Sequence, residues 1–109
     1  MLYMALGRPK IYMNVKDLRD GMRSVDVEGE ISEMGEPRTV NLKNGDEARV
    51  ADCKLRDESG EVRLSLWGEQ IDRVKVGSKV RIEKGYTSTF RSELGLNVGR
   101  YGKLDVLES

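Results

Sequence analysis

Short runs of alternating apolar and polar residues constrain the fold of this chain more than any other feature. The clearest run is VRLSLW at residues 62–67. With the two-residue period of a β-strand, its valine and leucines lie on one face, whereas Arg63, Ser65 and Trp67 lie on the other. Burial alone would more often place a tryptophan with the apolar residues than against them. The run therefore predicts a half-buried strand with an outward tryptophan beside an arginine.

Trp67 is the only tryptophan of the chain, and the pattern leaves two interpretations of it. As a structural residue, it would end the strand and fold back over an edge of the core. As a functional residue, it would form an aromatic platform beside positive charge, which is the kind of surface that binds unstacked nucleic-acid bases. Both interpretations remain open at this point, and the second is our working hypothesis.

Turn signals separate the other runs and give an order of elements. The first half has a strand at 25–31, a hairpin in which Asn44-Gly45 joins 38–43 to 47–57, and a strand at 61–67. A short helix at 68–76 follows, and then strands at 79–84 and 94–98. Leu104, Val106 and Leu107 are expected to close the sheet. This order predicts an all-β fold, a five-stranded closed Greek-key OB-fold barrel with a short helix between strands 3 and 4. An SH3-like barrel and a flat β-sandwich are the alternatives, and the position of the helix favours the OB fold.

Length and residue types limit the class of protein. The chain has 109 residues, which suffice for one domain with one core, and no apolar run approaches the roughly 18 residues of a membrane span. We expect a flexible arm over residues 1–14 and one domain over residues 15–107. With no histidine and one cysteine, Cys53, the chain lacks the usual zinc ligands and any histidine-assisted nucleophile. We therefore expect no enzyme activity, no cofactor and no metal, and a protein of the reducing cytoplasm.

The charge is balanced overall but not along the chain. Formal net charge is 0, so bulk charge does not indicate a nucleic-acid-binding protein. Residues 17–36 contain seven acidic and two basic residues, whereas residues 79–103 contain six basic and two acidic residues. A neutral total can thus hide one acidic and one basic side. Ordinary solvated strand faces would give the same pattern.

Several motifs together resemble a known family. The runs VKDLRDGM, VNLKNG, VADCKLRDESGEVRLSLWG, IEKGYTSTF and LGLNVGRYGKL are similar to the archaeal single-OB single-stranded-DNA-binding proteins. They are equally similar to the OB subunit of the human complex that senses single-stranded DNA. The resemblance spans residues 15–106 with the motifs in the same order. It implies an OB fold that binds single-stranded DNA with little sequence preference, during replication, recombination or repair.

The resemblance also implies a set of binding residues. Trp67, Tyr86 and Phe90 match the aromatics on which bases stack, Arg38 matches a basic residue of the first long loop, and Arg100 lies where some relatives contact a phosphate. Arg63, Lys84 and Arg91 are further candidates for phosphate contacts. Relatives usually continue into a tail that recruits partners, whereas this chain ends at Ser109. Asn97 stands where some relatives have an aromatic, so we expect weaker binding at that end of the groove.

Alternation alone does not place Tyr86 in a binding groove. Tyr86 has the same parity as Val80 and Ile82, so it would face the core unless Gly85 shifts the phase of the strand. From the residues alone, Tyr86 and Phe90 are equally compatible with the core and with the surface. The resemblance favours the groove for both.

Three other functions remain as alternatives. An OB fold also binds single-stranded RNA, because stacking does not inspect the 2′-hydroxyl. A protein-interaction module could use Trp67 and Phe90 as anchors for a partner chain. A metal-dependent enzyme would need Asp52, Asp57 and Glu58 to cluster, although Asp-Glu-Ser-Gly is ordinary turn chemistry. We expect a monomer that binds single-stranded DNA, does not bind membranes and acts alongside repair or replication proteins.

Overall fold

A computed structural model describes residues 12–99 and 101–108 of the chain. Its elements are a 3-10 helix and an α-helix combined with a seven-stranded sheet. In chain order they are η2 (Val15–Asp17), β1 (Val25–Met34), β2 (Arg38–Asn41), β3 (Glu47–Asp57), β4 (Gly60–Trp67), α1 (Glu69–Arg73), β5 (Lys79–Phe90), β6 (Glu93–Asn97) and β7 (Lys103–Glu108). The chain is therefore built mainly of β-strands, as the alternating runs predict.

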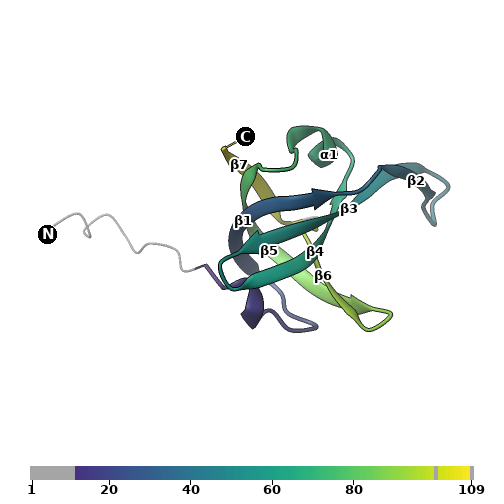
Figure 1. Cartoon of the computed structure of the whole chain (residues 1–109). Coiled ribbons are helices and arrows are strands. Elements are labelled where there is room, and N and C mark those ends of the chain that lie inside the picture. Colours follow the sequence, from purple (N-terminus) through teal and green to yellow (C-terminus); the bar gives the residue numbers. More distant parts are fainter. Residues whose placement is uncertain (1–11, 100, 109) are drawn as a thin grey trace, which may run out of the picture.

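The strand pairings form a ring (Figure 1). They run from β1 through β3, β4 and β6 to β5, and β5 pairs again with β1. β2 pairs with β3 and β7 pairs with β5, outside this ring. The β4–β6 pairing is parallel, whereas the other pairings are antiparallel. Strands distant in sequence therefore share one curved sheet, with a single hydrophobic core inside it.

Within the described residues the sheet has seven strands rather than the predicted five, because two strands, β2 and β7, pair outside the ring of five. β2 forms a separate strand of the β2–β3 hairpin, and the residues predicted to close the sheet after the last strand form β7, separate from β6. The separation of β6 from β7 has a local cause. Gly99 has a positive φ of 78°, and a Cβ on Gly102 would lie 1.8 Å from the carbonyl oxygen of Val98, so the backbone turns tightly between the two strands.

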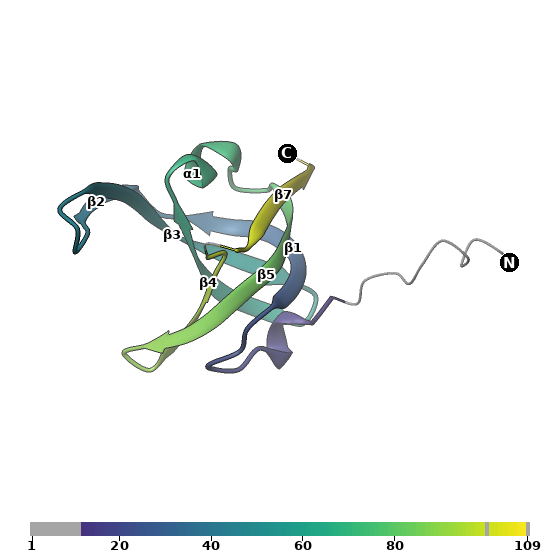
Figure 2. The same cartoon turned by 180° about the vertical axis from the view of Figure 1, so that it is seen from behind.

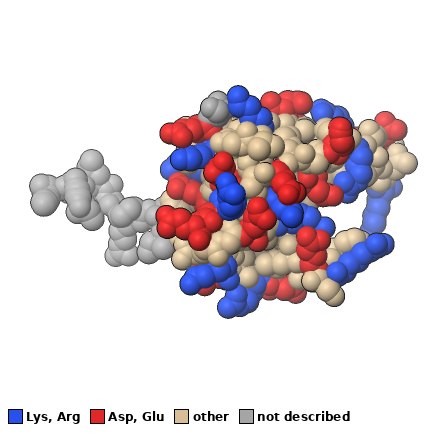
Figure 3. Space-filling view, viewed as in Figure 1, with Lys and Arg blue, Asp and Glu red and all other residues tan. Residues whose placement is uncertain are grey.

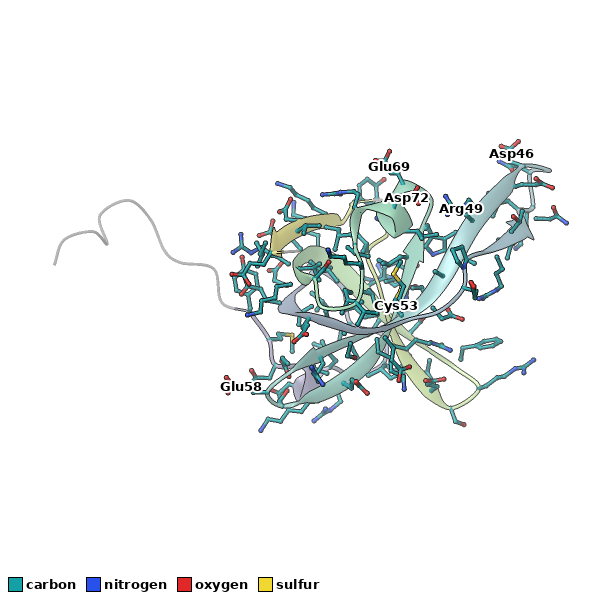
Figure 4. The ribbon with its side chains drawn as sticks, turned by 45° about the horizontal axis from the view of Figure 1, so that its top comes forward. Asp46, Arg49, Cys53, Glu58, Glu69 and Asp72 are labelled. Atoms are coloured by element: carbon teal, nitrogen blue, oxygen red, sulfur yellow. The ribbon has the colours of Figure 1, made fainter. Side chains whose placement is uncertain are left out.

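The inward positions of the strands form the core. In β4, Val62, Leu64 and Leu66 are buried, as predicted, and in β3 Ala51, Cys53 and Leu55 are buried. Burial raises the pKa of the Cys53 thiol, and this residue packs as a small apolar side chain. Figure 4 labels Cys53 in the interior of the molecule. The predicted orientation of these two strands is confirmed.

The connection between β4 and β5 contains the helix α1, which is shorter than the predicted helix at 68–76. Gly68 precedes it with a φ of 58°, and Gly77 follows with a φ of 98°. Ile71 is buried and packs into the core. In Figure 4, Asp72 of α1 lies near Arg49 of β3, and the two side chains form an ion pair at 3.3 Å. The short helix is thus held against the start of β3.

The predicted hairpin around Asn44-Gly45 is confirmed. β2 pairs with β3 from Arg38 opposite Val50 to Asn41 opposite Glu47. Gly45 has a positive φ of 92°, and the Asn44 side-chain oxygen accepts the backbone N–H of Asp46 at 2.9 Å. Figures 1 and 2 show this hairpin and the β5–β6 hairpin projecting from the same side of the molecule.

The start of the chain is described only from Tyr12 onwards, so most of the predicted arm, residues 1–11, lies outside the described residues. Tyr12 donates a hydrogen bond to Glu83 at 3.3 Å, and the guanidinium of Arg81 lies 5.3 Å from the centre of its ring. Met13 forms a parallel bridge with Val27 of β1. The last residues of the predicted arm therefore lie against the sheet.

Asp57 connects the η2 helix to the turn between β3 and β4. Its carboxylate accepts the backbone N–H of Val15 at 2.8 Å, and also accepts the Ser59 hydroxyl and the N–H groups of Ser59 and Gly60. Burial would raise the pKa of Asp57, but these hydrogen bonds outweigh it, so the pKa lies below its ordinary value of 3.8. The predicted Asp-Glu-Ser-Gly turn is therefore confirmed, and it also fixes η2.

The first prediction is that Asp57→Ala lowers the free energy of unfolding at pH 7 by about 1.5–3 kcal/mol, because hydrogen bonds to a charged acceptor are lost. Since the folded-state pKa is lowered, this stabilisation is fully present above the unfolded pKa and disappears as the pH falls through the folded pKa. Urea denaturation from pH 7 down to pH 2 measures both effects. The difference between the two proteins should shrink below the ordinary pKa of 3.8.

Asp20→Ala is the matched control, because Asp20 is an exposed aspartate in the loop between η2 and β1. It should change the free energy of unfolding by less than about 0.5 kcal/mol. A loss at Asp57 that is equally large at low pH would contradict a role for its charge.

Candidate nucleic-acid interface

Outward side chains of β3, β4, β6 and β5 form one continuous surface, which we call the outer sheet face. The register of the strands places residues of neighbouring strands side by side in rows across this face. In the middle row, Ser65 of β4 lies beside Asn97 of β6, and Asn97 lies opposite Tyr86 of β5. Asp52 of β3 lies opposite Ser65 and completes the row. The face therefore crosses four strands without interruption, with Trp67 beyond one side of this row and Phe90 beyond the other.

Trp67 ends β4 and points outward, with 41% of its surface exposed. Its register partner on β3 is Val50, which is 3% exposed although it has the outward parity of that strand. Arg38 of β2 lies opposite Val50 in turn. The Trp67 backbone N–H donates to the side-chain oxygen of Gln70 at 3.1 Å, which fixes the end of the strand. Trp67 is thus an exposed aromatic in the same register row as Arg38, two strands away, and its outward orientation is the one that its parity predicts.

Tyr86 also points outward, because the phase of β5 changes before it. Ile82 is buried, Glu83 and Lys84 both lie outside the core, and Gly85 is buried. Lys84 has a positive φ of 57°, which is unusual for a residue with a side chain and marks the irregularity. The shift reverses the parity predicted by simple alternation, so Tyr86 is 42% exposed.

The ring of Tyr86 lies directly against Gly99. A Cβ on Gly99 would be 2.9 Å from the Cε1 atom of Tyr86, and the positive φ of Gly99 also disfavours a side chain there. On the other side, a Cβ on Gly85 would be 2.8 Å from the carbonyl oxygen of Asn97. Two glycines therefore allow close approach of β5 and the end of β6, and they set the position of the tyrosine ring.

Phe90 is the most exposed of the three predicted stacking residues, at 61%. It ends β5 opposite Glu93, so only Arg91 and Ser92 connect β5 to β6. Both of these residues have positive φ angles, 54° and 67°, as a two-residue type I′ turn requires. The guanidinium carbon of Arg91 lies 5.1 Å from the centre of the Phe90 ring. The hairpin tip thus carries an aromatic and a cation together.

Arg63 occupies the middle of the outer sheet face. Its Nη1 donates to Glu93 at 3.2 Å, and its guanidinium lies over Gly95, where a Cβ would be 3.4 Å from Nη2. The Nε atom is buried and has no hydrogen-bond partner among the described residues. A buried donor without a partner costs about 1–3 kcal/mol, so the guanidinium has hydrogen-bonding capacity that this arrangement does not use.

The remaining predicted cations are distributed around this surface. Arg38 forms an ion pair with Asp52 at 3.0 Å, and both side chains are exposed. Lys84 is exposed two residues before Tyr86, and its backbone N–H donates to Asp26 at 3.1 Å. Arg100 lies outside the described residues. Figure 3 shows basic side chains along the rim of the hollow between the β2–β3 and β5–β6 hairpins.

Two further residues of this region are missing from the sequence-based set. Tyr101 lies between β6 and β7 and is 81% exposed. Lys54 of β3 lies opposite Arg63, and its Nζ is 3.8 Å from Glu33. Alternation in β3 already predicts that Lys54 points outward, but it does not predict that Lys54 shares a face with Phe90 and Tyr86. Only the β4–β6 pairing brings these strands together.

The acidic residues considered for a metal site do not form one. Asp52 lies on the outer sheet face with Arg38, whereas Asp57 is saturated by hydrogen bonds at the η2 end of the molecule. Among residues 12–99 and 101–108, no group of three or more His, Cys, Asp or Glu side chains is arranged to hold a metal ion. No helix in these same ranges is long and apolar enough to cross a membrane.

Comparison with known proteins gives the family. Residues 19–106 match the family model described as "Single-stranded DNA binding protein Ssb-like, OB fold". The chain belongs to this family. The family consists of binding proteins and is not enzymatic, and its fold is the all-β OB fold. The resemblance stated from the sequence motifs is thereby confirmed.

Individual relatives agree with this assignment. The chain is 34% identical over 90 residues to the single-stranded DNA binding protein Ssb of Saccharolobus solfataricus, which covers 83% of this chain and 60% of that protein. It is 31% identical over 94 residues to replication factor A of Methanothermobacter thermautotrophicus, covering 85% of this chain and 12% of that protein. The chain therefore corresponds to only part of the length of each relative.

A solved structure shows the same fold. The NMR structure of the replication factor A related protein from Methanobacterium thermoautotrophicum has a TM-score of 0.73 and 23% sequence identity with this chain. The superposition covers 89% of this chain and 91% of that chain. At this level of identity the likeness concerns the path of the backbone, so the roles of individual side chains must be argued from this chain itself.

The second prediction concerns the hairpin tip. Ser92→Gly should raise the free energy of unfolding by roughly 0.5–1 kcal/mol, because relief of the left-handed strain exceeds the entropy cost of glycine. The variant keeps Arg91 and Phe90, and urea denaturation measures the change. Ser88→Gly, within the regular part of β5, is the control and should lower the stability by about 0.5–1 kcal/mol. Destabilisation by Ser92→Gly would contradict the type I′ turn.

Proposed function

We propose that this chain binds single-stranded DNA with little sequence preference by stacking successive bases on Trp67, Tyr86 and Phe90. The observation that carries the proposal is that all three rings are exposed on one continuous sheet face, at 41%, 42% and 61%. We further infer that the ring of strands, closed by the β5–β1 pairing, acts as a rigid Greek-key barrel that presents this face. Membership of a DNA-binding family supports the proposal.

Stacking supplies affinity without reading sequence. Each base stacked on an aromatic side chain contributes about 1–3 kcal/mol, as judged by alanine substitution, because every base has a flat face. The three rings lie on different rows of the sheet, with Trp67 and Phe90 on opposite sides of the row that contains Tyr86 and with β6 between their two strands. A strand crossing β4, β6 and β5 could therefore contact the rings one after another, with the phosphates at the rim.

The cations of the face are available to phosphates despite their present ion pairs. Arg38 pairs with Asp52, and Arg63 pairs with Glu93. The exposed Arg38–Asp52 pair is worth only about 0–1 kcal/mol, so a phosphate can replace this carboxylate at little cost. Arg63 is less exposed, but its Nε, which has no partner among the described residues, is a donor that a phosphate could satisfy. Lys84 and Arg91 are exposed near the two ends of the Tyr86–Phe90 segment, and we include Arg100 as a further contact on the basis of the family motif. Duplex DNA should bind poorly, because its bases are already stacked and cannot reach the rings.

The names of the relatives suggest the setting in which the chain acts. One is named a single-stranded DNA binding protein and another a replication factor A. We propose that this chain covers exposed single strands in the cytoplasm during replication, with recombination and repair as related settings. It would do so as a monomer, in contact with replication or repair proteins.

The third prediction tests the stacking surface. Titration with a short oligo-dT should quench Trp67 fluorescence, and anisotropy of a labelled oligonucleotide should show that Phe90→Ala weakens binding by about 5- to 150-fold, the equivalent of 1–3 kcal/mol. Leu107→Ala is the matched control, since Leu107 is exposed on β7, outside the outer sheet face. It should leave the affinity unchanged.

Three outcomes in which an oligonucleotide does bind would contradict the proposal. The first is binding without quenching, which would place the strand away from Trp67. The second is equal affinity for duplex DNA, which would indicate a purely electrostatic surface. The third is a stronger interaction with the same sequence as RNA, which would make RNA the ligand. Absence of binding to any oligonucleotide would leave a protein-interaction module as the better description.

The fourth prediction concerns ionic strength. If three or four phosphates are neutralised, the plot of log affinity against log salt should have a slope of about −2 to −3 for a single strand. Arg38→Ala and Arg63→Ala should each bring the slope about 0.7 closer to zero. Lys75→Ala, on an exposed loop after α1, should not change it. A slope that none of these substitutions alters would place the phosphates elsewhere.

A further inference from the structure

A cleft lies at the end of the molecule covered by η2, next to the outer sheet face. β4 and β6 pair from Arg63 and Gly95 onwards, and before this point the two strands separate. The space between them has a volume of about 440 Å³, which is in the range of small-molecule sites, roughly 300–1,000 Å³. Residues of η2, the first residues of β4 and the first residues of β6 line it.

The floor and the rim of this cleft differ in chemistry. Val15, Leu18, Val62 and Leu94 line it with apolar surface and pack with the core. Three cations, Lys16, Lys54 and Arg63, also line the cleft. An apolar floor below a cationic rim is suited to a ligand with a flat apolar part and a negative charge, as a nucleotide has.

The two carboxylates of the cleft do not cancel its positive charge. Glu61 accepts a hydrogen bond from the Ser32 hydroxyl at 2.7 Å, and Glu93 accepts one from Arg63 at 3.2 Å. With three cations and two carboxylates, the lining carries a net charge of +1. Lys16 has no ion-pair partner among the described residues. Its ammonium is therefore available to a phosphate.

The cleft is continuous with the proposed DNA-binding surface. Lys54, Arg63, Gly95 and Ser88 form one row across β3, β4, β6 and β5. Arg63 belongs to this row and to the wall of the cleft. Ser92, at the tip that follows Phe90, also lines the cleft. A strand that leaves the Phe90 ring therefore meets the cleft next.

The separated strands add hydrogen-bonding groups. Residues 60–62 of β4 pair with β3 on one side but precede the pairing with β6 on the other. Backbone N–H and C=O groups at such a strand edge are strong donors and acceptors. They lie where the edge of a base would enter the cleft, so this position could discriminate between bases although the stacking rings do not.

We propose that this cleft binds the nucleotide that follows the one stacked on Phe90, with its base against the apolar floor and its phosphate between Lys16 and Lys54. The inference rests on the proposed binding of single-stranded DNA. It adds a subsite beyond the three rings, and it makes η2 part of the binding surface. Charge complementarity and continuity with the outer sheet face favour a nucleic-acid strand over a peptide as the occupant.

The fifth prediction tests this subsite with two lengths of oligo-dT, one of about five and one of about eight nucleotides, within the range known for one OB fold. Lys16→Glu should weaken binding of the longer strand by at least tenfold and leave the shorter strand nearly unaffected. Lys16→Ala should bring the salt slope for the longer strand about 0.7 closer to zero. Lys75→Glu, the same charge reversal beyond α1, is the matched control and should affect neither length.

Each outcome separates the subsite from the general function. If wild-type protein binds both lengths and Lys16→Glu changes neither affinity, the subsite is excluded and the stacking surface remains. If Lys16→Glu weakens binding of both oligonucleotides equally, the subsite is also excluded, because Lys16 would then act only through long-range electrostatic attraction. If wild-type protein binds neither strand, the proposed function itself fails. Thermal melting of each variant verifies folding, which should be unaffected because the contact of Lys16 with Ser59 is made by its backbone N–H.

Discussion

The left-handed backbone at Lys84 is the constraint on which the outer sheet face depends. Before it, β5 pairs with β1 and β7 and buries Val80 and Ile82. After it, Gly85 is buried opposite Val25 of β1, and the strand pairs with β6 from Tyr86 onwards. A regular strand would turn the Tyr86 ring into the core. A non-glycine residue in this conformation costs about 1–2 kcal/mol, and the hydrogen bond from the Lys84 N–H to Asp26 offsets part of that cost.

The η2 end of the molecule connects stability with the proposed subsite. Asp57 holds the first residue of η2, and Thr87 of β5 holds the following loop through hydrogen bonds with Met22 and Arg19. These contacts place Val15 and Leu18 under the gap between β4 and β6. Loss of the Asp57 charge would therefore loosen the floor of the cleft as well as the fold, whereas Lys16 affects only its rim.

Local patterns predicted the strands well because alternation reports directly on burial. The orientation of Trp67, the core positions of β3 and β4, and the Asn44-Gly45 hairpin all follow from two-residue periodicity and turn chemistry. Tyr86 could not be placed in this way, because a left-handed lysine leaves no mark in the sequence pattern. The cleft could not be predicted either, since it depends on parallel pairing between strands about 30 residues apart. The strand count differs from five because β2 and β7 form additional strands that pair outside the ring.

The neutral total charge of the chain affects how strongly the outer sheet face would bind single-stranded DNA. The Arg38–Asp52, Lys54–Glu33 and Arg63–Glu93 pairs place carboxylates beside the cations that would meet phosphates. A phosphate that binds one of these three cations would have to displace a carboxylate, so the electrostatic gain would be smaller than for a free cation, and the aromatic rings would have to supply much of the affinity. Displaced carboxylates also recapture their partners when the strand leaves. The same residues that lower the affinity would therefore favour rapid release and limit non-specific binding to duplex DNA.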